Sequence, residues 1–130
     1  MTDHTVTLSK KDIDNPNKPT TDTWVDNVKA SDTVTIQMPK GVGLDFKGSI
    51  DQFQADEDVK VLEPKDGSIS KRAAYDYING APPRLSADNM SVTLTIAADA
   101  RPCKLQFKVR VRNTATGNHH DVDPGVIITV

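Results

Sequence analysis

The chain has 130 residues, of which 36% are hydrophobic, 26% are charged and only 5% are aromatic. This length suits one domain with one hydrophobic core, and the balance of apolar and charged residues excludes a disordered or membrane-embedded chain. The formal net charge of −2 at pH 7 lacks the strongly basic character of nucleic-acid-binding domains, so we expect no nucleic-acid partner.

Period-two alternation of apolar and polar residues predicts β-strands along most of the chain. In the first half the clearest strand is 33–38, where Val34, Ile36 and Met38 share one face and Pro39 ends the pattern. A looser strand runs through Leu44 and Phe46. Shorter candidates are residues 4–8, 24–28, 50–53 and 59–62, with a polar loop over residues 10–23.

Residues 71–79 form the one segment with helical spacing, and Gly80, Pro82 and Pro83 would end a helix there. The pattern leaves a short helix and an irregular loop both open. Tyr75, Tyr77 and Arg84 belong to this longest non-strand stretch. Because binding residues are often carried on loops above a rigid scaffold, we interpret these three as candidate residues of a recognition surface.

The last third alternates most regularly. Strands are predicted at 91–97, 104–112 and 125–130, with a turn at 116–118. In the 104–112 strand the outward residues include four cations, Lys104, Lys108, Arg110 and Arg112. Such a row can meet an acidic partner, pair with carboxylates on a neighbouring strand or protect an edge strand. We favour a solvated face.

The expected fold is all-β: one antiparallel, immunoglobulin-like β-sandwich over residues 1–130, with at most one short helix around 71–79. A parallel βαβ sheet is excluded because no helical segment of adequate length separates the strands. The final strand, GVIITV, is a candidate sheet edge for self-association, and a place in the centre of a sheet is equally open.

The C-terminal third also resembles a known family. The strand KLQFKVRVRN, the turn TATGN, Asp123-Pro124 and the strand GVIITV follow one another as in the closing hairpin of the DP-EP family, small uncharacterised bacterial β-sandwich proteins. The threonine- and valine-containing strand at residues 4–8 is similar to the start of those proteins. The resemblance implies a β-sandwich fold and no particular activity.

Possible metal ligands are densest at His119, His120, Asp121 and Asp123. Imidazoles and carboxylates suit zinc, and loop carboxylates suit calcium. However, adjacent residues of an extended chain point to opposite faces, so neighbouring histidines rarely share one ion. We therefore favour a solvated hairpin loop and expect no cofactor.

No catalytic motif surrounds Cys103 or any serine, so we expect no enzyme activity. A single cysteine excludes an internal disulfide, the N-terminus lacks an apolar leader, and no stretch reaches membrane-spanning length. These features predict a cytoplasmic protein without a membrane partner. The leading hypothesis is a non-enzymatic binding or assembly module of bacterial type, with another protein or a second copy as partner. The alternative is a sandwich that binds calcium, zinc or a small ligand through the 119–123 loop.

Overall fold

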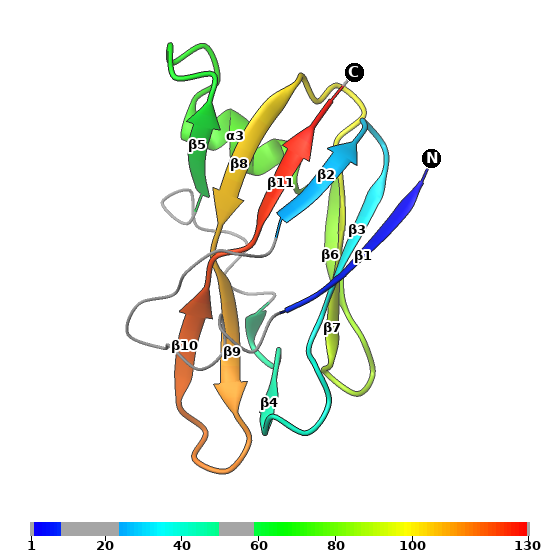
Figure 1. The fold of residues 1–130 in the computed structure, drawn as a ribbon, viewed down its shortest axis with the longest axis vertical. Coiled ribbons are helices and arrows are strands. Elements are labelled where there is room, and N and C mark those ends of the chain that lie inside the picture. The colour runs from blue at the N-terminus through cyan, green and yellow to red at the C-terminus, as the bar shows by residue number, and fades with distance from the viewer. Residues whose placement is uncertain (1, 9–23, 50–58, 130) are drawn as a thin grey trace.

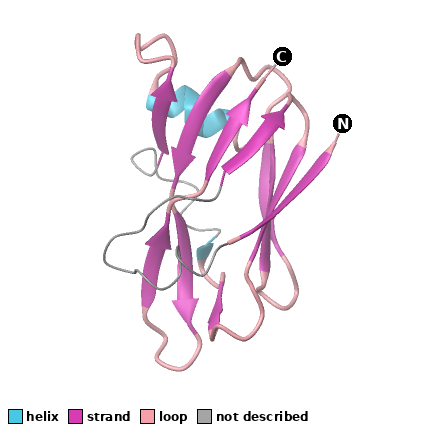
Figure 2. Ribbon diagram, in the orientation of Figure 1, coloured by secondary structure: helices cyan, strands magenta, loops and turns pink. Residues whose placement is uncertain are grey.

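The computed structural model describes residues 2–8, 24–49 and 59–129 (Figure 1), so the strand predicted at 50–53 and the loop predicted at 10–23 lie outside the described residues. In chain order the described elements are β1 (Asp3–Thr7), β2 (Trp24–Val28), β3 (Thr33–Gln37), β4 (Leu44–Asp45), β5 (Val59–Glu63), α3 (Lys71–Tyr77), β6 (Ala81–Leu85), β7 (Ser91–Thr95), β8 (Cys103–Phe107), β9 (Val109–Asn113), β10 (His119–Val122) and β11 (Gly125–Ile128). The protein is mainly β, as the alternation predicts (Figure 2).

The strands form packed layers. One sheet has the order β1-β3-β7-β6, a second has β2-β11-β8-β5, and a smaller third has β10-β9-β4. The second and third sheets follow each other along the molecule, because β8 leads into β9 across Lys108 and β10 leads into β11 across Asp123 and Pro124 (Figure 1). The first sheet lies opposite them.

The long strand predicted at 104–112 is therefore two strands in two sheets. Its alternation is unbroken, since Leu105, Phe107, Val109 and Val111 are all buried. The backbone partners nevertheless change at Lys108: β8 pairs with β5 and β11, whereas β9 pairs with β4 and β10. Side-chain periodicity carries no signal of this exchange, because it records only which face is buried.

The expectation of purely antiparallel pairing is wrong at two places. β1 runs parallel to β3, and β2 runs parallel to β11. Parallel neighbours require a long connection between them, which both pairs have. The pairing with β2 also places β11 between β2 and β8, so residues 125–128 lie inside a sheet rather than at its edge.

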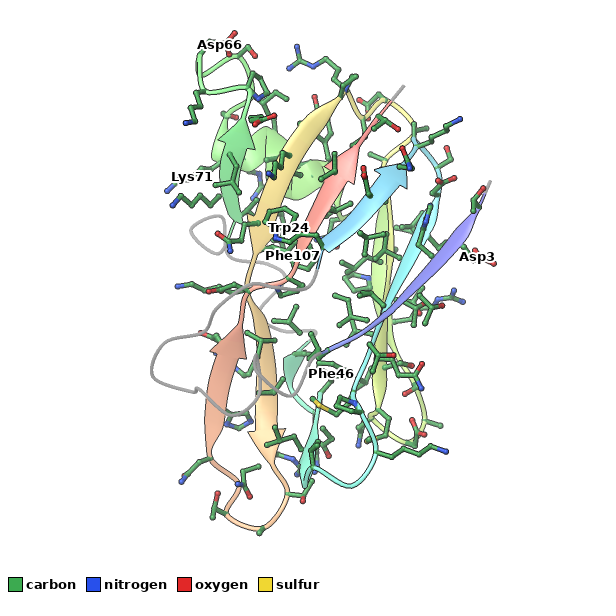
Figure 3. The ribbon with its side chains drawn as sticks, in the orientation of Figure 1. Asp3, Trp24, Phe46, Asp66, Lys71 and Phe107 are labelled. Carbon is green, nitrogen blue, oxygen red and sulfur yellow. The ribbon has the colours of Figure 1, made fainter. Side chains whose placement is uncertain are left out.

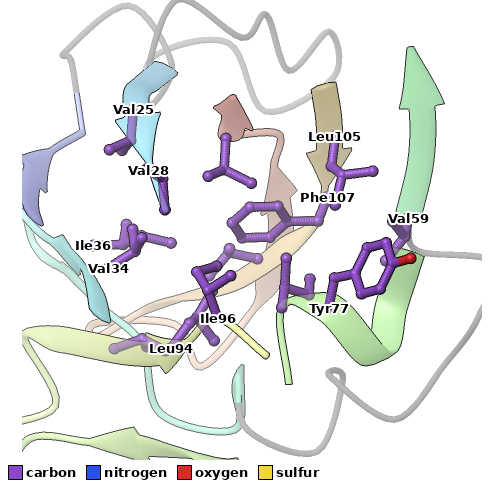
Figure 4. Close-up of a cluster of buried hydrophobic side chains, with 14 of the residues drawn as sticks. Val25, Val28, Val34, Ile36, Val59, Tyr77, Leu94, Ile96, Leu105 and Phe107 are labelled. Atoms are coloured by element: carbon purple, nitrogen blue, oxygen red, sulfur yellow. The ribbon is translucent and has the colours of Figure 1, made fainter. Parts of the chain in front are cut away.

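The core lies between the layers (Figure 4). Val34 and Ile36 of β3 stand opposite Leu94 and Val92 of β7, and all four are at most 2% exposed. On the other face of the same pair, the hydroxyls of Thr35 and Thr93 lie 3.0 Å apart. Burying each such aliphatic side chain contributes about 1.5–3 kcal/mol, so these cross-strand pairs stabilise the sheet and its packing together.

Residues 71–77 adopt the helical alternative. Ser70 caps α3 by accepting a hydrogen bond from the Ala73 N–H at 3.1 Å. The expectation that residues 81–85 belong to a loop is wrong, since they form β6. Proline is tolerated there because β6 is the last strand in its sheet, where a missing N–H removes no central ladder bond.

Within the described ranges, no helix has the length and apolar character needed to cross a membrane.

Candidate functional site

Three of the four predicted metal ligands belong to one strand. His119 to Val122 form β10 rather than a hairpin loop, and His119, His120 and Asp121 stand in register with Arg112, Val111 and Arg110 of β9. The His119 imidazole lies beside Gly48, with Nε2 3.7 Å from the place where a Cβ would stand on that glycine. Among the described residues no group of three or more His, Cys, Asp or Glu side chains is arranged to hold a metal ion.

The predicted recognition residues are separated. Tyr75 and Tyr77 are 4% and 8% exposed, because the helix turns both rings into the core. The Tyr77 hydroxyl accepts a hydrogen bond from Arg101 Nε at 3.0 Å. Arg84 is exposed on β6, in register with Thr93 of β7. The sequence pattern placed these three residues in one non-strand stretch, whereas the structure divides them between α3 and β6.

The four cations of the predicted basic row have different surroundings. Lys104 Nζ lies 5.1 Å from the centroid of the Trp24 ring, a cation–π contact. Arg112 forms an ion pair with Asp45, and Arg110 stands opposite Asp121 in the ladder. Lys108 is exposed at the link between β8 and β9. The cross-strand ion pair with Asp45 therefore explains the position of Arg112. Lys108 is exposed and makes no such pair with a described residue.

Lys108 borders a cavity on the surface of the described residues. This cavity has a volume of about 610 Å³ and lies where β5, β8 and the start of α3 meet the two links between sheets. Its polar lining consists of Lys60, Lys71, Gln106, Lys108 and Asp123. Its apolar lining consists of Val59, Val61, Ile69 and Phe107. Small-molecule and peptide sites commonly fall between about 300 and 1,000 Å³, so this cavity has the size of a binding site.

Ordinary sheet geometry positions these residues. Lys60 and Gln106 are register partners on β5 and β8, and their neighbours Val59 and Phe107 point to the opposite, buried face. Lys71 is the first residue of α3. Lysines from β5, from α3 and from the β8–β9 link thus border one cavity, which no local sequence pattern could indicate.

The charge at this cavity is unbalanced. Lys60, Lys71 and Lys108 are exposed, and none of them forms an ion pair with another residue of the described ranges. Asp123 contributes one carboxylate against these three ammonium groups. Among the described residues, the lining of this cavity therefore carries a net positive charge.

Another cavity, of about 450 Å³, lies next to Cys103 and is lined mainly by apolar residues. Burial raises the pKa of the Cys103 thiol to about 11, so the side chain stays protonated at neutral pH. Because the thiolate is the nucleophilic form, this environment suits a structural cysteine rather than a reactive one.

A buried hydrogen-bonded cluster around Asp32 was missed by the sequence interpretation. Asp32 is 3% exposed, and His4 Nε2 lies 2.9 Å from its Oδ2. The backbone N–H groups of Lys29 and Thr2 also donate to its carboxylate, at 2.9 and 2.8 Å. These bonds, first of all the one to His4, lower the Asp32 pKa to about 2. The cluster joins the N-terminal strand to the β2–β3 turn and is structural.

A comparison with models of known protein families gives no match, and neither does a comparison with curated protein sequences. The functional argument therefore depends on the geometry and charge of the cavity.

Proposed function

We propose that the chain is an immunoglobulin-like β-sandwich that acts as a non-enzymatic binding domain, and that the lysine-lined cavity binds an anionic ligand. In immunoglobulin domains, strands A to G are arranged as ABED in one sheet and CFG in the other. With β1, β3, β5, β6, β7, β8 and β11 taken as A to G, the observed orders β1-β3-β7-β6 and β5-β8-β11 correspond to these two sheets. The parallel β1–β3 pair and the additional strand β2 depart from that pattern.

The observation that carries the binding role is the set of three lysines without an ion-pair partner among the described residues. Holding like charges around one cavity costs repulsion energy, which an anionic ligand would relieve. Val61, the partly exposed apolar residue of the lining, supplies some area to bury, and the polar groups can orient a ligand. An anion at this cavity would therefore gain both electrostatic and hydrophobic stabilisation.

The surroundings of the reactive side chains support binding rather than catalysis. The carboxylates of Asp32 and Asp45 are held in hydrogen bonds that join strands and turns. The Cys103 thiol is protonated at neutral pH. The resemblance to the DP-EP family stays a prediction. It implies a β-sandwich fold and no particular activity.

Calorimetric titration with tripolyphosphate, a strongly anionic probe, tests the proposal. We expect binding that weakens as salt rises, because screening shortens the reach of the three charges. The triple variant K60Q/K71Q/K108Q should weaken binding by at least about threefold, since each exposed charge contact is worth about 0.2–1 kcal/mol. The matched control K40Q/K47Q/K65Q removes the same charge outside the cavity. Equal losses in both variants, or no binding at all, would refute the proposed site.

A further inference from the structure

The cavity borders the end strand of a sheet. In the order β2-β11-β8-β5, β8 is the only strand among the described residues that pairs with β5. A strand at the end of a sheet can accept another strand, because every second residue directs its N–H and C=O outward. The far edge of the opposite sheet is different, since β6 contains Pro82 and Pro83, which have no N–H to offer.

Two of the three lysines lie at this edge, and Lys108 lies at the link between β8 and β9. Lys60 lies on β5 itself, and Lys71 begins the helix that packs against β5. In Figure 3, Lys71 lies beside β5 on the side away from β8. A strand added to β5 would therefore run past ammonium groups. Acidic side chains are the ones that such a row would attract.

The floor of the cavity favours a second kind of side chain in the same ligand. Val61 and Ile69 line the cavity next to the β5 edge, and Ile69 is buried. In an extended peptide, side chains alternate between faces and recur on one face about every 6.6 Å. Apolar residues on one face can cover the partly exposed Val61, while acidic residues on the other face meet Lys60.

We infer that the natural occupant is an extended acidic segment of another polypeptide, with acidic and apolar residues in alternation, which adds as a strand to the outer edge of β5. This inference depends on the proposed anion-binding function and names its ligand class. Backbone hydrogen bonds to β5 would supply affinity, and the lysines and Val61 would supply selectivity.

Fluorescence anisotropy with short labelled peptides tests this. The first peptide alternates Glu and Val, the second replaces each Glu by Lys, and the third keeps the acidic sequence but carries N-methyl groups on alternate backbone amides. We expect the acidic peptide to bind. The basic peptide, and the acidic peptide with the K60Q/K71Q/K108Q variant, should bind at least about threefold more weakly. N-methylation of the amides that face β5 should cost at least as much, because it removes donors without changing charge.

The backbone hydrogen bonds are tested by modifying the peptide and not β5, because a proline substituted into β5 could unfold the sheet. Two results separate the two proposals. The N-methyl groups can be placed on either of the two alternate sets of backbone amides. If tripolyphosphate binds in a lysine-dependent manner but both methylated peptides bind as tightly as the unmethylated acidic peptide, strand addition is refuted and anion binding stands. If neither tripolyphosphate nor the acidic peptide binds, both proposals are overturned.

Discussion

Arg112 holds the buried carboxylate of Asp45 through two hydrogen bonds, from Nε to Oδ1 at 3.1 Å and from Nη2 to Oδ2 at 2.6 Å. The pair is the side-chain counterpart of the short β4–β9 ladder, in which the same two residues are register partners. The Lys47 N–H donates to the same carboxylate at 3.1 Å. The guanidinium beside Asp45 lowers the pKa of that carboxyl below its usual value.

Removing the cation should therefore destabilise the third sheet. We expect Arg112→Ala to lower the free energy of unfolding by about 1–3 kcal/mol. This is less than the 3–5 kcal/mol typical of a fully buried pair, because the Arg112 side chain is 27% exposed. Arg112→Lys should restore only part of the loss, since an ammonium cannot make the two-pronged contact. Urea unfolding measures both, with the exposed Arg84→Ala as control; equal effects of R112A and R84A would contradict the role of the pair.

The Asp32 cluster predicts a defined acid sensitivity. The folded-state pKa of about 2 lies below the ordinary value of 3.8, so the unfolded chain binds the proton first as pH falls. The stabilisation from the Asp32 charge is thus complete above about pH 5 and is lost as pH decreases from about 4 to 2.

Asp32→Asn removes that charge while conserving size. We expect it to cost about 1–3 kcal/mol at pH 7, the usual range for hydrogen bonds to a charged group. The difference from the parent protein should shrink as pH falls toward 2. Urea midpoints of both proteins across this pH range measure it, and a difference that does not change with pH would rule out the charge as the cause.

Gly125 and Trp24 form a close contact that allows an optical test. A Cβ on Gly125 would lie 2.0 Å from Cζ3 of Trp24, far inside van der Waals contact. We expect Gly125→Ala to displace the ring, to destabilise the fold by about 1–3 kcal/mol and to shift the fluorescence of the chain's single tryptophan. In the double variant W24A/G125A the additional cost of the alanine should largely disappear, because the clashing ring is gone. Additive costs in the double variant would show that the strain lies elsewhere.

Cys103 provides a test at alkaline pH. Its folded-state pKa of about 11 lies above the ordinary value of 9.0, so the unfolded chain loses the thiol proton first as pH rises. Stability from the neutral buried thiol is therefore complete below about pH 8 and falls between about pH 9 and 11. Cys103→Ala should flatten this part of the stability profile.

A thiol reagent provides the kinetic form of the same prediction. Cys103 is 6% exposed, so dithionitrobenzoate at pH 8 should react slowly with the folded protein and rapidly once urea unfolds it. Fast labelling of the folded protein would mean that the buried environment of the thiol does not persist in solution.

Local pattern was sufficient for much of the fold. The buried faces of the strands at 33–38, 91–97 and 104–112 agree with their alternation, because facing water or core is a property of each residue relative to its neighbours. The short helix at 71–77 was one of two alternatives open from spacing and flanking residues. What the pattern could not show was that Tyr75 and Tyr77 are buried, since helical spacing does not reveal which side of a short helix faces the core.

Sequence alone thus determined the all-β class of the protein, the position of most strands and the strand residues that fill its core. The tertiary structure decided which strands pair, where the strand through Lys108 changes sheets, and that Asp32 meets His4 while Lys60, Lys71 and Lys108 surround one cavity. The physical reason is the range of the interactions. Alternation and turn chemistry act over a few residues, whereas strand pairing and the convergence of charges join residues that are distant in the chain and close only when it is folded.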